Sequence, residues 1–94
     1  MSVLPIEWIP LIIKEHGSRI KPKPVDLMIN KHDRICNFIF ESPDERNEFE
    51  VEFNKTLQRA IRIFIESQEE DPKKFNRNIL LESRSEGNAL TFRY

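Results

Sequence analysis

Residues of the kinds that carry chemistry are few in this 94-residue sequence, and they lie far apart. Neither histidine, His16 or His32, has a second histidine or a cysteine at the spacing that zinc sites use. A zinc site would need carboxylates gathered from elsewhere in the chain, so we predict no metal site and no cofactor. The single cysteine, Cys36, lies in the apolar run 35–40, where a buried and unreactive thiol is expected.

Patterns typical of nucleophilic or phosphate chemistry are absent as well. No serine lies in a Gly-x-Ser-x-Gly pattern, and two glycines, Gly17 and Gly87, are too few for a phosphate-binding loop. Glu48 and Glu52 would lie one helical turn apart, but a solvated helix face accounts for them more readily than acid–base catalysis. We therefore expect a protein that is not an enzyme and has no catalytic residue of its own.

The charges are balanced overall but unevenly distributed. The net charge is −1, so nothing global draws the chain to nucleic acid or membrane. Residues 14–34 hold six basic and three acidic side chains, whereas residues 41–71 hold ten acidic and four basic ones. The basic residues lie between Trp8 and the pair Phe38 and Phe40, a combination that single-stranded nucleic acids can use. We nevertheless disfavour a nucleic-acid binder, because the acidic segment would repel phosphates.

The N-terminal residues and the cysteine content indicate a cytoplasmic location. Met1 to Ile13 is apolar but contains Glu7, Pro5 and Pro10 and has no basic region before it, unlike a signal peptide. No apolar run is long enough to span a bilayer. A lone cysteine cannot form an internal disulfide, which fits a reducing compartment.

Residues 43–67 are predicted to form a long amphipathic helix. Ser42 can cap the helix, Pro43 suits its first position, and Glu45 completes a capping box. An apolar stripe follows at steps of three and four residues, formed by Phe49, Phe53, Leu57, Ala60, Ile61 and Phe64. Because proline cannot continue a helix, we expect this one to end before Pro72.

A β-hairpin is predicted upstream of the helix. Residues 25–29 alternate between apolar and polar, residues 31–34 are a polar turn, and residues 35–40 are a second strand, which we expect to be buried on both faces. The N-terminal stretch is ambiguous. Ile9, Ile12, Ile13 and His16 fit a short helix that ends at Gly17, but the prolines and the β-branched pair fit an edge strand, which we favour slightly.

Residues 71–94 follow as a linker and a possible second hairpin. Residues 78–84 and 89–94 could pair across residues 85–88, and a disordered tail is the alternative. Unpaired edge strands invite association, so we predict that this segment docks on the sheet or is replaced there by a second chain. We accordingly divide the chain into a partial domain, 1–70, and this C-terminal segment, 71–94.

The order of the elements resembles part of a known family. An apolar stretch, VLPIEWIPLII, precedes a basic loop, a strand VDLMIN, a turn KHDR, a strand ICNFIF and the helix ESPDERNEFEVEFNKTLQRAI. Over roughly residues 3–64 this resembles the second half of a pleckstrin homology domain, as in Rho-family guanine nucleotide exchange factors. That family usually has a tryptophan on the helix, where this chain has Phe49 or Phe53. The first four strands of the barrel and the exchange domain have no counterpart.

The resemblance implies an α+β fold: a partial barrel of antiparallel strands capped by the long helix. It also implies a non-catalytic regulatory module of small-GTPase signalling, a fragment or short form of an exchange factor. The partner would be a Rho-family GTPase or its exchange domain, and the protein would lie peripherally at the membrane. The resemblance puts the 31–34 turn at the open end of the barrel. Lys31, His32 and Arg34 would then carry any weak contact with a phosphoinositide anion.

The charge distribution supports an alternative function. The chain would then be a small antiparallel α+β protein-binding domain, an inhibitor or adaptor that uses its acidic helix against a basic target. The two hypotheses predict different architectures. A curved sheet of three consecutive strands capped by the 43–67 helix would favour the pleckstrin-homology reading. An N-terminal helix packed on a flat four-stranded sheet would favour the protein-binding domain.

Overall fold

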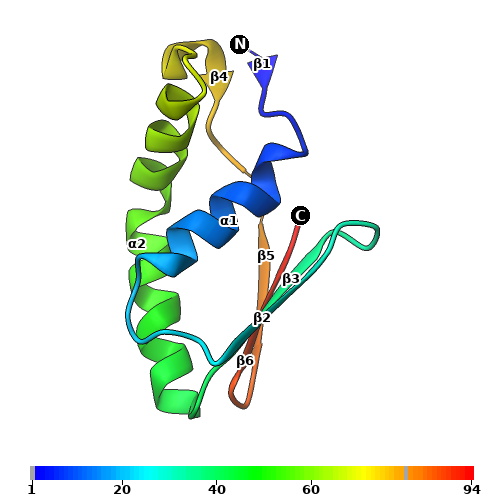
Figure 1. The fold of residues 1–94 in the computed structure, drawn as a ribbon, viewed down its shortest axis with the longest axis vertical. Coiled ribbons are helices and arrows are strands. Elements are labelled where there is room, and N and C mark those ends of the chain that lie inside the picture. Colours follow the sequence, from blue (N-terminus) through cyan, green and yellow to red (C-terminus); the bar gives the residue numbers. More distant parts are fainter. Residues whose placement is uncertain (1, 80) are drawn as a thin grey trace.

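In the computed structural model, which describes residues 2–79 and 81–94, two helices lie on one side of a four-stranded antiparallel sheet (Figure 1). The expected α+β class with one long helix is confirmed, and the sheet is open rather than closed into a barrel. In chain order the elements are β1 (Ser2–Val3), α1 (Trp8–Ser18), β2 (Asp26–Asn30), β3 (Ile35–Ile39), α2 (Pro43–Ser67), the 3₁₀ turn η1 (Pro72–Lys74), β4 (Phe75–Asn76), β5 (Glu82–Glu86) and β6 (Ala89–Arg93).

The C-terminal hairpin docks on the sheet, as one of the two predicted outcomes requires. The strand order is β2-β3-β6-β5, so β6 pairs with β3 on one side and with β5 on the other. A two-residue turn joins β5 to β6, and Gly87 in that turn has a φ of +58°, which glycine adopts without strain. Residues on both sides of position 70 therefore share one sheet. Residue 80, within the predicted 78–84 strand, lies outside the described residues.

The helix α2 has the predicted bounds. Ser42 is in an extended conformation, and its hydroxyl accepts a hydrogen bond from the Glu45 amide at 3.2 Å, while Pro43 occupies the first turn. The helix ends at Ser67, before Pro72, and Glu69 then has a φ of +61°. The buried side chains on α2 include Phe49, Phe53, Ile61 and Phe64 from the predicted stripe. The hairpin of β2 and β3 is confirmed too.

The slightly favoured N-terminal strand is wrong, because residues 8–18 are helical. Pro10 is the third residue of α1, where an amide has no acceptor within the helix, so a proline is tolerated. The β-branched pair Ile12 and Ile13 is 1% and 0% exposed, and burial of these side chains outweighs their modest helix propensity. The first strand that the pleckstrin-homology resemblance needs is therefore a helix.

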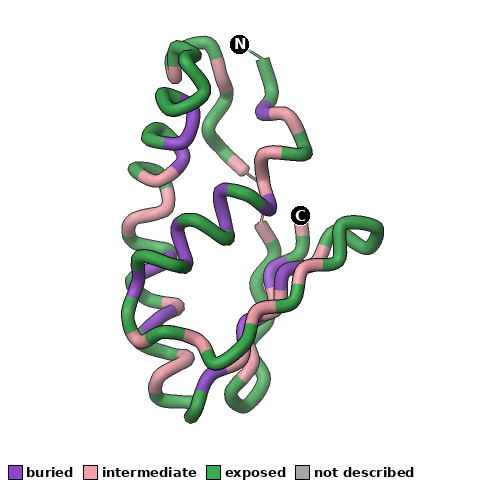
Figure 2. Tube along the Cα trace, in the orientation of Figure 1, coloured by how far each residue is buried: buried purple, intermediate pink, exposed green. Residues whose placement is uncertain are grey.

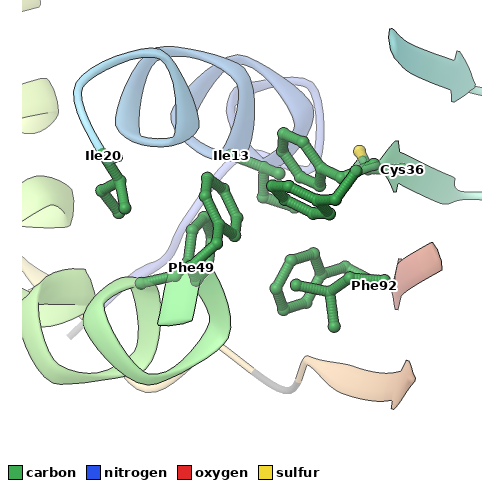
Figure 3. Packing of buried hydrophobic residues seen from close by; sticks show 9 residues of the cluster. Ile13, Ile20, Cys36, Phe49 and Phe92 are labelled. Carbon is green, nitrogen blue, oxygen red and sulfur yellow. The ribbon is translucent and has the colours of Figure 1, made fainter. Parts of the chain in front are cut away.

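The core lies between the helices and the inner face of the sheet (Figures 2 and 3). It consists of Ile13, Ile20, Cys36, Phe38, Phe40, Phe49, Phe53, Leu90 and Phe92. The ring centroids of Phe53 and Phe92 are 4.6 Å apart, and those of Phe40 and Phe49 are 4.8 Å apart. As predicted, Cys36 is buried, and this burial raises the pKa of its thiol to about 11, so the thiolate is scarce at neutral pH.

A second cluster joins the other end of the helices to the short β1–β4 ladder. It contains Leu4, Ile12, Ile61, Phe64 and Ile65. The Trp8 ring packs beside it, with centroid distances of 5.6 Å to both Phe64 and Phe75. The β1–β4 pairing is parallel. No helix of the described residues is long and apolar enough to cross a membrane.

No element of residues 2–79 and 81–94 covers the outer face of the sheet, so the expectation that β3 is buried on both faces is wrong. Cys36 and Phe38 point into the core, whereas Ile35, Asn37 and Ile39 are only half-buried. Met28 on the same outer face is 53% exposed. The apolar run of β3 reflects isoleucines on the outer face rather than a second layer of structure.

Candidate functional site

A groove of about 660 Å³ lies between α1 and α2. The two helices run in opposite directions along it, because Trp8 at the start of α1 packs on Phe64 near the end of α2, whereas His16 near the end of α1 packs on Phe53 in the first half of α2. The lining residues from α1 and the segment after it are Ile12, Glu15, His16, Arg19, Ile20 and Lys21. Those from α2 are Glu48, Glu52, Thr56, Arg59, Ala60, Ile63, Phe64 and Ser67. We call this cavity the α1–α2 groove.

His16 forms the polar centre of the groove. The residue is 8% exposed, and its Nε2 lies 3.0 Å from the Phe53 carbonyl oxygen and 3.2 Å from Thr56 Oγ1. The Thr56 hydroxyl donates its only hydrogen to the Glu52 carbonyl oxygen at 2.8 Å. Both neighbours of Nε2 therefore act as acceptors, and the proton of the neutral imidazole is assigned to Nε2. The imidazole ring also packs on the Phe53 ring, with centroids 4.6 Å apart.

The surroundings of His16 favour its neutral form. Burial lowers the pKa of the imidazole from its ordinary value of 6.5, and the positive charge of Arg19 acts in the same direction. The hydrogen bond to the Phe53 carbonyl and the negative charge of Glu52 raise the pKa and offset part of this effect. The net direction is downward, so the imidazole is neutral at pH 7 and stabilises the contact between the helices as a hydrogen-bond donor.

Charged side chains of both signs surround this centre without pairing directly. Glu48 and Glu52 lie one turn apart on α2, and Arg19 and Lys21 belong to the opposite wall. All four are exposed, and none forms an ion pair within 4.0 Å among the described residues. Ile63, which is 37% exposed, supplies apolar surface, whereas Ile12 and Ile20 line the groove but are 1% and 5% exposed. The groove thus combines apolar surface with unpaired charges.

The polar groups of the groove are committed to the helix backbone. Thr56 and His16 bond carbonyl oxygens of α2, and the Ser67 hydroxyl donates to the Phe64 carbonyl oxygen at 2.6 Å. No group of three or more metal-ligating side chains comes together in residues 2–79 and 81–94.

The three residues that the pleckstrin-homology resemblance selected lie together at the turn between β2 and β3. Lys31, His32 and Arg34 are exposed there, and all three line a second cavity of about 370 Å³ with Ile6, Glu7, Pro10 and Tyr94. Asp33 fixes the turn, because its amide bonds the Asn30 side chain at 3.0 Å and its carboxylate accepts from Asn30 Nδ2 at 2.9 Å. Arg34 has a φ of +56°. The turn protrudes at the end of the hairpin in Figure 1.

The sequence did not predict the α1–α2 groove, because the groove exists only if residues 8–18 are helical. One feature of the sequence could have indicated the groove. His16 falls on the same helical stripe as Ile9, Ile12 and Ile13, so a helix would carry an imidazole on its buried face. The turn residues, by contrast, are neighbours in sequence and needed no tertiary information.

Comparisons with family models, curated proteins and solved structures give no match to this chain. The pleckstrin-homology resemblance and its Rho-family partner therefore stay predictions, and the geometry of the chain itself is what supports a function.

Proposed function

We propose that the protein is a non-catalytic binding module that accepts a basic, amphipathic helix of a partner protein in the α1–α2 groove. The observation that carries this proposal is the combination of apolar surface at Ile63 and unpaired carboxylates at Glu48 and Glu52 in one cavity of about 660 Å³. Amphipathic helices bind in grooves of this kind through apolar anchors at helical spacing, and charges at the rim fix their orientation.

The charge of α2 favours a basic partner. Asp44 and Glu45 lie in the first turn, where carboxylates stabilise the positive end of the helix dipole. Glu48 and Glu52 lie beyond that turn, so the dipole does not account for them. Glu50 is partly neutralised by Arg46 at 3.7 Å. Glu41, Asp44, Glu48 and Glu52 remain exposed and without an ion pair among the described residues. The basic side chains that line the groove are Arg19 and Lys21 on the opposite wall and Arg59 on α2 itself.

The architecture supports the same proposal. The protein-binding alternative predicts an N-terminal helix packed on a flat four-stranded sheet, and the fold has the N-terminal helix and the four antiparallel strands. The groove depends on that helix, because six of its lining residues come from α1 and the segment directly after it. A partner helix would therefore contact both of the helical elements of the fold.

A titration with a model peptide tests the proposal. The probe is a helical peptide of lysine and leucine with one apolar face, added to the ¹⁵N-labelled full chain and followed by amide chemical shifts. We expect saturable shifts concentrated at His16, Thr56 and Ile63. The double variant Glu48→Lys, Glu52→Lys should weaken binding by about tenfold or more, since two attractive charges become repulsive.

The control variant is Glu69→Lys, Glu70→Lys, which changes the net charge equally at exposed positions beyond the groove. This variant should bind the peptide nearly as the wild type does. If both double variants weaken binding equally, or if the shifts spread over the whole surface, the interaction reflects net charge alone and the groove is not the site.

A second candidate function is weak binding of a phosphorylated anion at the 31–34 turn. It is supported by the cavity of about 370 Å³ that Lys31, His32 and Arg34 line together. Glu7 lines the same cavity, and its carboxylate opposes an anion, so the affinity should be low.

Co-sedimentation with vesicles that contain a phosphoinositide tests this second candidate. The double variant Lys31→Ala, Arg34→Ala should pellet less than the wild type, and Glu7→Gln should pellet more. Soluble inositol phosphate added as a competitor separates headgroup binding from general adsorption. Equal pelleting of the wild type and the double variant would show that the turn does not bind the anion.

A further inference from the structure

The strand β5 forms one open edge of the sheet. It pairs with β6 on one side only, and all five of its residues, Glu82 to Glu86, are exposed. Side chains on both faces of β5 are exposed because the strand lies at the edge of the sheet, where neither helix covers its inner face. An edge strand of this kind presents unpaired backbone groups to solvent.

The hydrogen bonds of β6 identify the β5 residues whose backbone groups face outward. The Tyr94 amide donates to the Arg34 carbonyl oxygen at 3.0 Å, and the Asn88 carbonyl oxygen accepts from the Phe40 amide at 2.9 Å. The backbone groups of even-numbered β6 residues therefore bond towards β3, and those of odd-numbered residues bond towards β5. The β5 partners of these odd-numbered residues are Glu82, Arg84 and Glu86. The amide and carbonyl groups of Ser83 and Ser85 point away from the sheet.

The opposite edge, β2, is partly closed. By the same alternation, the backbone amide and carbonyl groups of Met28 and Asn30 point towards β3. Those of Leu27 and Ile29 point away from the sheet. The Leu27 amide already donates to Asp26 Oδ1 at 2.8 Å. Pro24 lies two residues before the strand and has no amide hydrogen to offer. Neither Ser83 nor Ser85 has a comparable side-chain partner among the described residues.

The sequence of β5, Glu-Ser-Arg-Ser-Glu, reads the same in both directions. Two antiparallel copies with matched faces can meet with Ser83, Arg84 or Ser85 on the two-fold axis. Centring on Arg84 sets arginine against arginine and Glu82 against Glu86, which repels. Centring on Ser85 sets Arg84 against Glu86 twice, which attracts, but it also sets Ser83 against Gly87, which belongs to the turn. Centring on Ser83 sets Glu82 against Arg84 twice. On the inner face it sets Ser83 against Ser83 and Ser85 against the half-buried Leu81.

We propose that two copies of this chain associate through their β5 edges, antiparallel and centred on Ser83, so that the two four-stranded sheets become one continuous sheet. Backbone bonds between the two Ser83 residues, and between Ser85 and Leu81, hold the contact together with two Glu82–Arg84 pairs. For these pairs Arg84 exchanges its exposed ion pair with Glu86 of its own strand, at 3.9 Å, for Glu82 of the second copy. In antiparallel pairs without mutual backbone bonds the side chains lie closest, and Glu82 and Arg84 occupy such positions. The contact is small, so the association is weak and depends on concentration. It is independent of the α1–α2 groove.

Charge-swap variants test this register by sedimentation velocity from about 10 µM to about 1 mM, where weak association becomes visible. Arg84→Glu sets glutamate against glutamate, and Glu82→Arg sets arginine against arginine. Each variant alone should self-associate about tenfold or more weakly than the wild type. An equimolar mixture should regain dimers, because both cross-strand pairs are attractive again. Glu69→Arg, with the same change of net charge as Glu82→Arg, should behave like the wild type.

Amide hydrogen exchange provides a second readout. Protection of the Ser83 and Ser85 amides should rise with protein concentration, whereas the Arg84 amide, which bonds within its own sheet, should not change. Ser83→Pro removes one outward donor without breaking the β5–β6 ladder, and it should abolish the dimer. The proposal is overturned if the wild type stays monomeric at about 1 mM, if Glu82→Arg alone dimerises normally, or if the mixture associates no better than its components.

Discussion

His16 brings an imidazole into the apolar contact between α1 and α2. Its Nε2 donates towards two acceptors on α2, so the side chain satisfies a polar group that would otherwise be buried without a partner. The protonated ring would place a charge in the same surroundings, close to Arg19. The residue thus links the stability of the helix pair, and with it the α1–α2 groove, to pH.

Acidification should destabilise the protein through His16. Because the pKa of His16 is lowered in the folded state, the unfolded chain binds the proton more tightly. The contribution of neutral His16 is therefore complete above its ordinary pKa of 6.5 and is lost as the pH falls below that value. We expect His16→Gln to cost about 1 to 3 kcal/mol at neutral pH and progressively less in acid.

Urea unfolding of both proteins between about pH 7.5 and pH 5 measures this difference. His32→Gln, at the exposed β2–β3 turn, is the matched control and should follow the wild type. A cost of His16→Gln that does not change with pH would contradict the assignment of a lowered pKa.

Gly17 is required by the close approach of α1 to the core. A β-carbon at this position would lie 2.9 Å from Cε1 and Cζ of Phe38 and 3.3 Å from Cζ of Phe49. Phe38 is 1% exposed and packs against several other rings, so it has little room to move. In most helices an alanine would be more stable than glycine by about 1 kcal/mol. Here we expect Gly17→Ala to destabilise by about 1 to 3 kcal/mol, as overpacking does.

Thermal unfolding decides the sign of this effect. Ser18→Ala, at the exposed neighbouring position, is the control and should change the melting temperature little. A higher melting temperature for Gly17→Ala would mean that the contact between α1 and the sheet is looser than the structure indicates.

At the scale of elements, a helix could be predicted from the sequence where its local signals agreed with one another. For α2 the cap at Ser42, the proline at its first position and the apolar stripe all indicate one helix, and both of its bounds were predicted. For α1 the stripe indicates a helix, but the β-branched pair and Pro10 indicate a strand. Burial by α2 and the sheet decided between them, and that information is not local.

The stripe of α2 should dominate the stability of the fold. Phe53 is 0% exposed, and its ring lies 4.6 Å from the Phe92 ring and 6.4 Å from the Phe38 ring. We expect Phe53→Ala to cost about 3 to 5 kcal/mol, as large-to-small core changes do. Ser42→Ala should cost about 1 kcal/mol through the lost cap. Val51→Ala, at a position on the same helix that is 60% exposed, should cost little and is the control for denaturant melts.

At the scale of the whole molecule, pairing between distant segments was the least predictable feature. Residues 89–93 lie about fifty positions beyond β3, yet they form its neighbour in the sheet. The sequence indicated a second hairpin and the need to cover an edge, but nothing local specifies which edge it takes. The α1–α2 groove was missed for a related reason, since it needs the correct state of α1 and its packing on α2 at once. The 31–34 turn is local and was placed correctly between its strands.

The position of β6 predicts that the chain unfolds as one unit, although its sequence suggested a division near residue 70. Leu90 is 0% exposed and Phe92 is 1% exposed, and both belong to the cluster that contains Phe49 and Phe53. Deletion of residues 78–94 would remove these side chains and bare the edge of β3, whose amide and carbonyl groups then lack partners. We expect the shortened chain to lose its cooperative thermal transition and to aggregate, as judged by light scattering at several concentrations.

A graded version of the same experiment keeps the chain complete. Phe92→Ala should cost about 3 to 5 kcal/mol and should lower the midpoint reported by Trp8 fluorescence, although Trp8 lies in the other cluster with Phe64 and Phe75. Arg93→Ala, the exposed neighbour of Phe92, should leave that midpoint nearly unchanged. If residues 1–77 alone stay monomeric and as stable as the full chain, the C-terminal hairpin is an accessory to the fold and β3 is protected by other means.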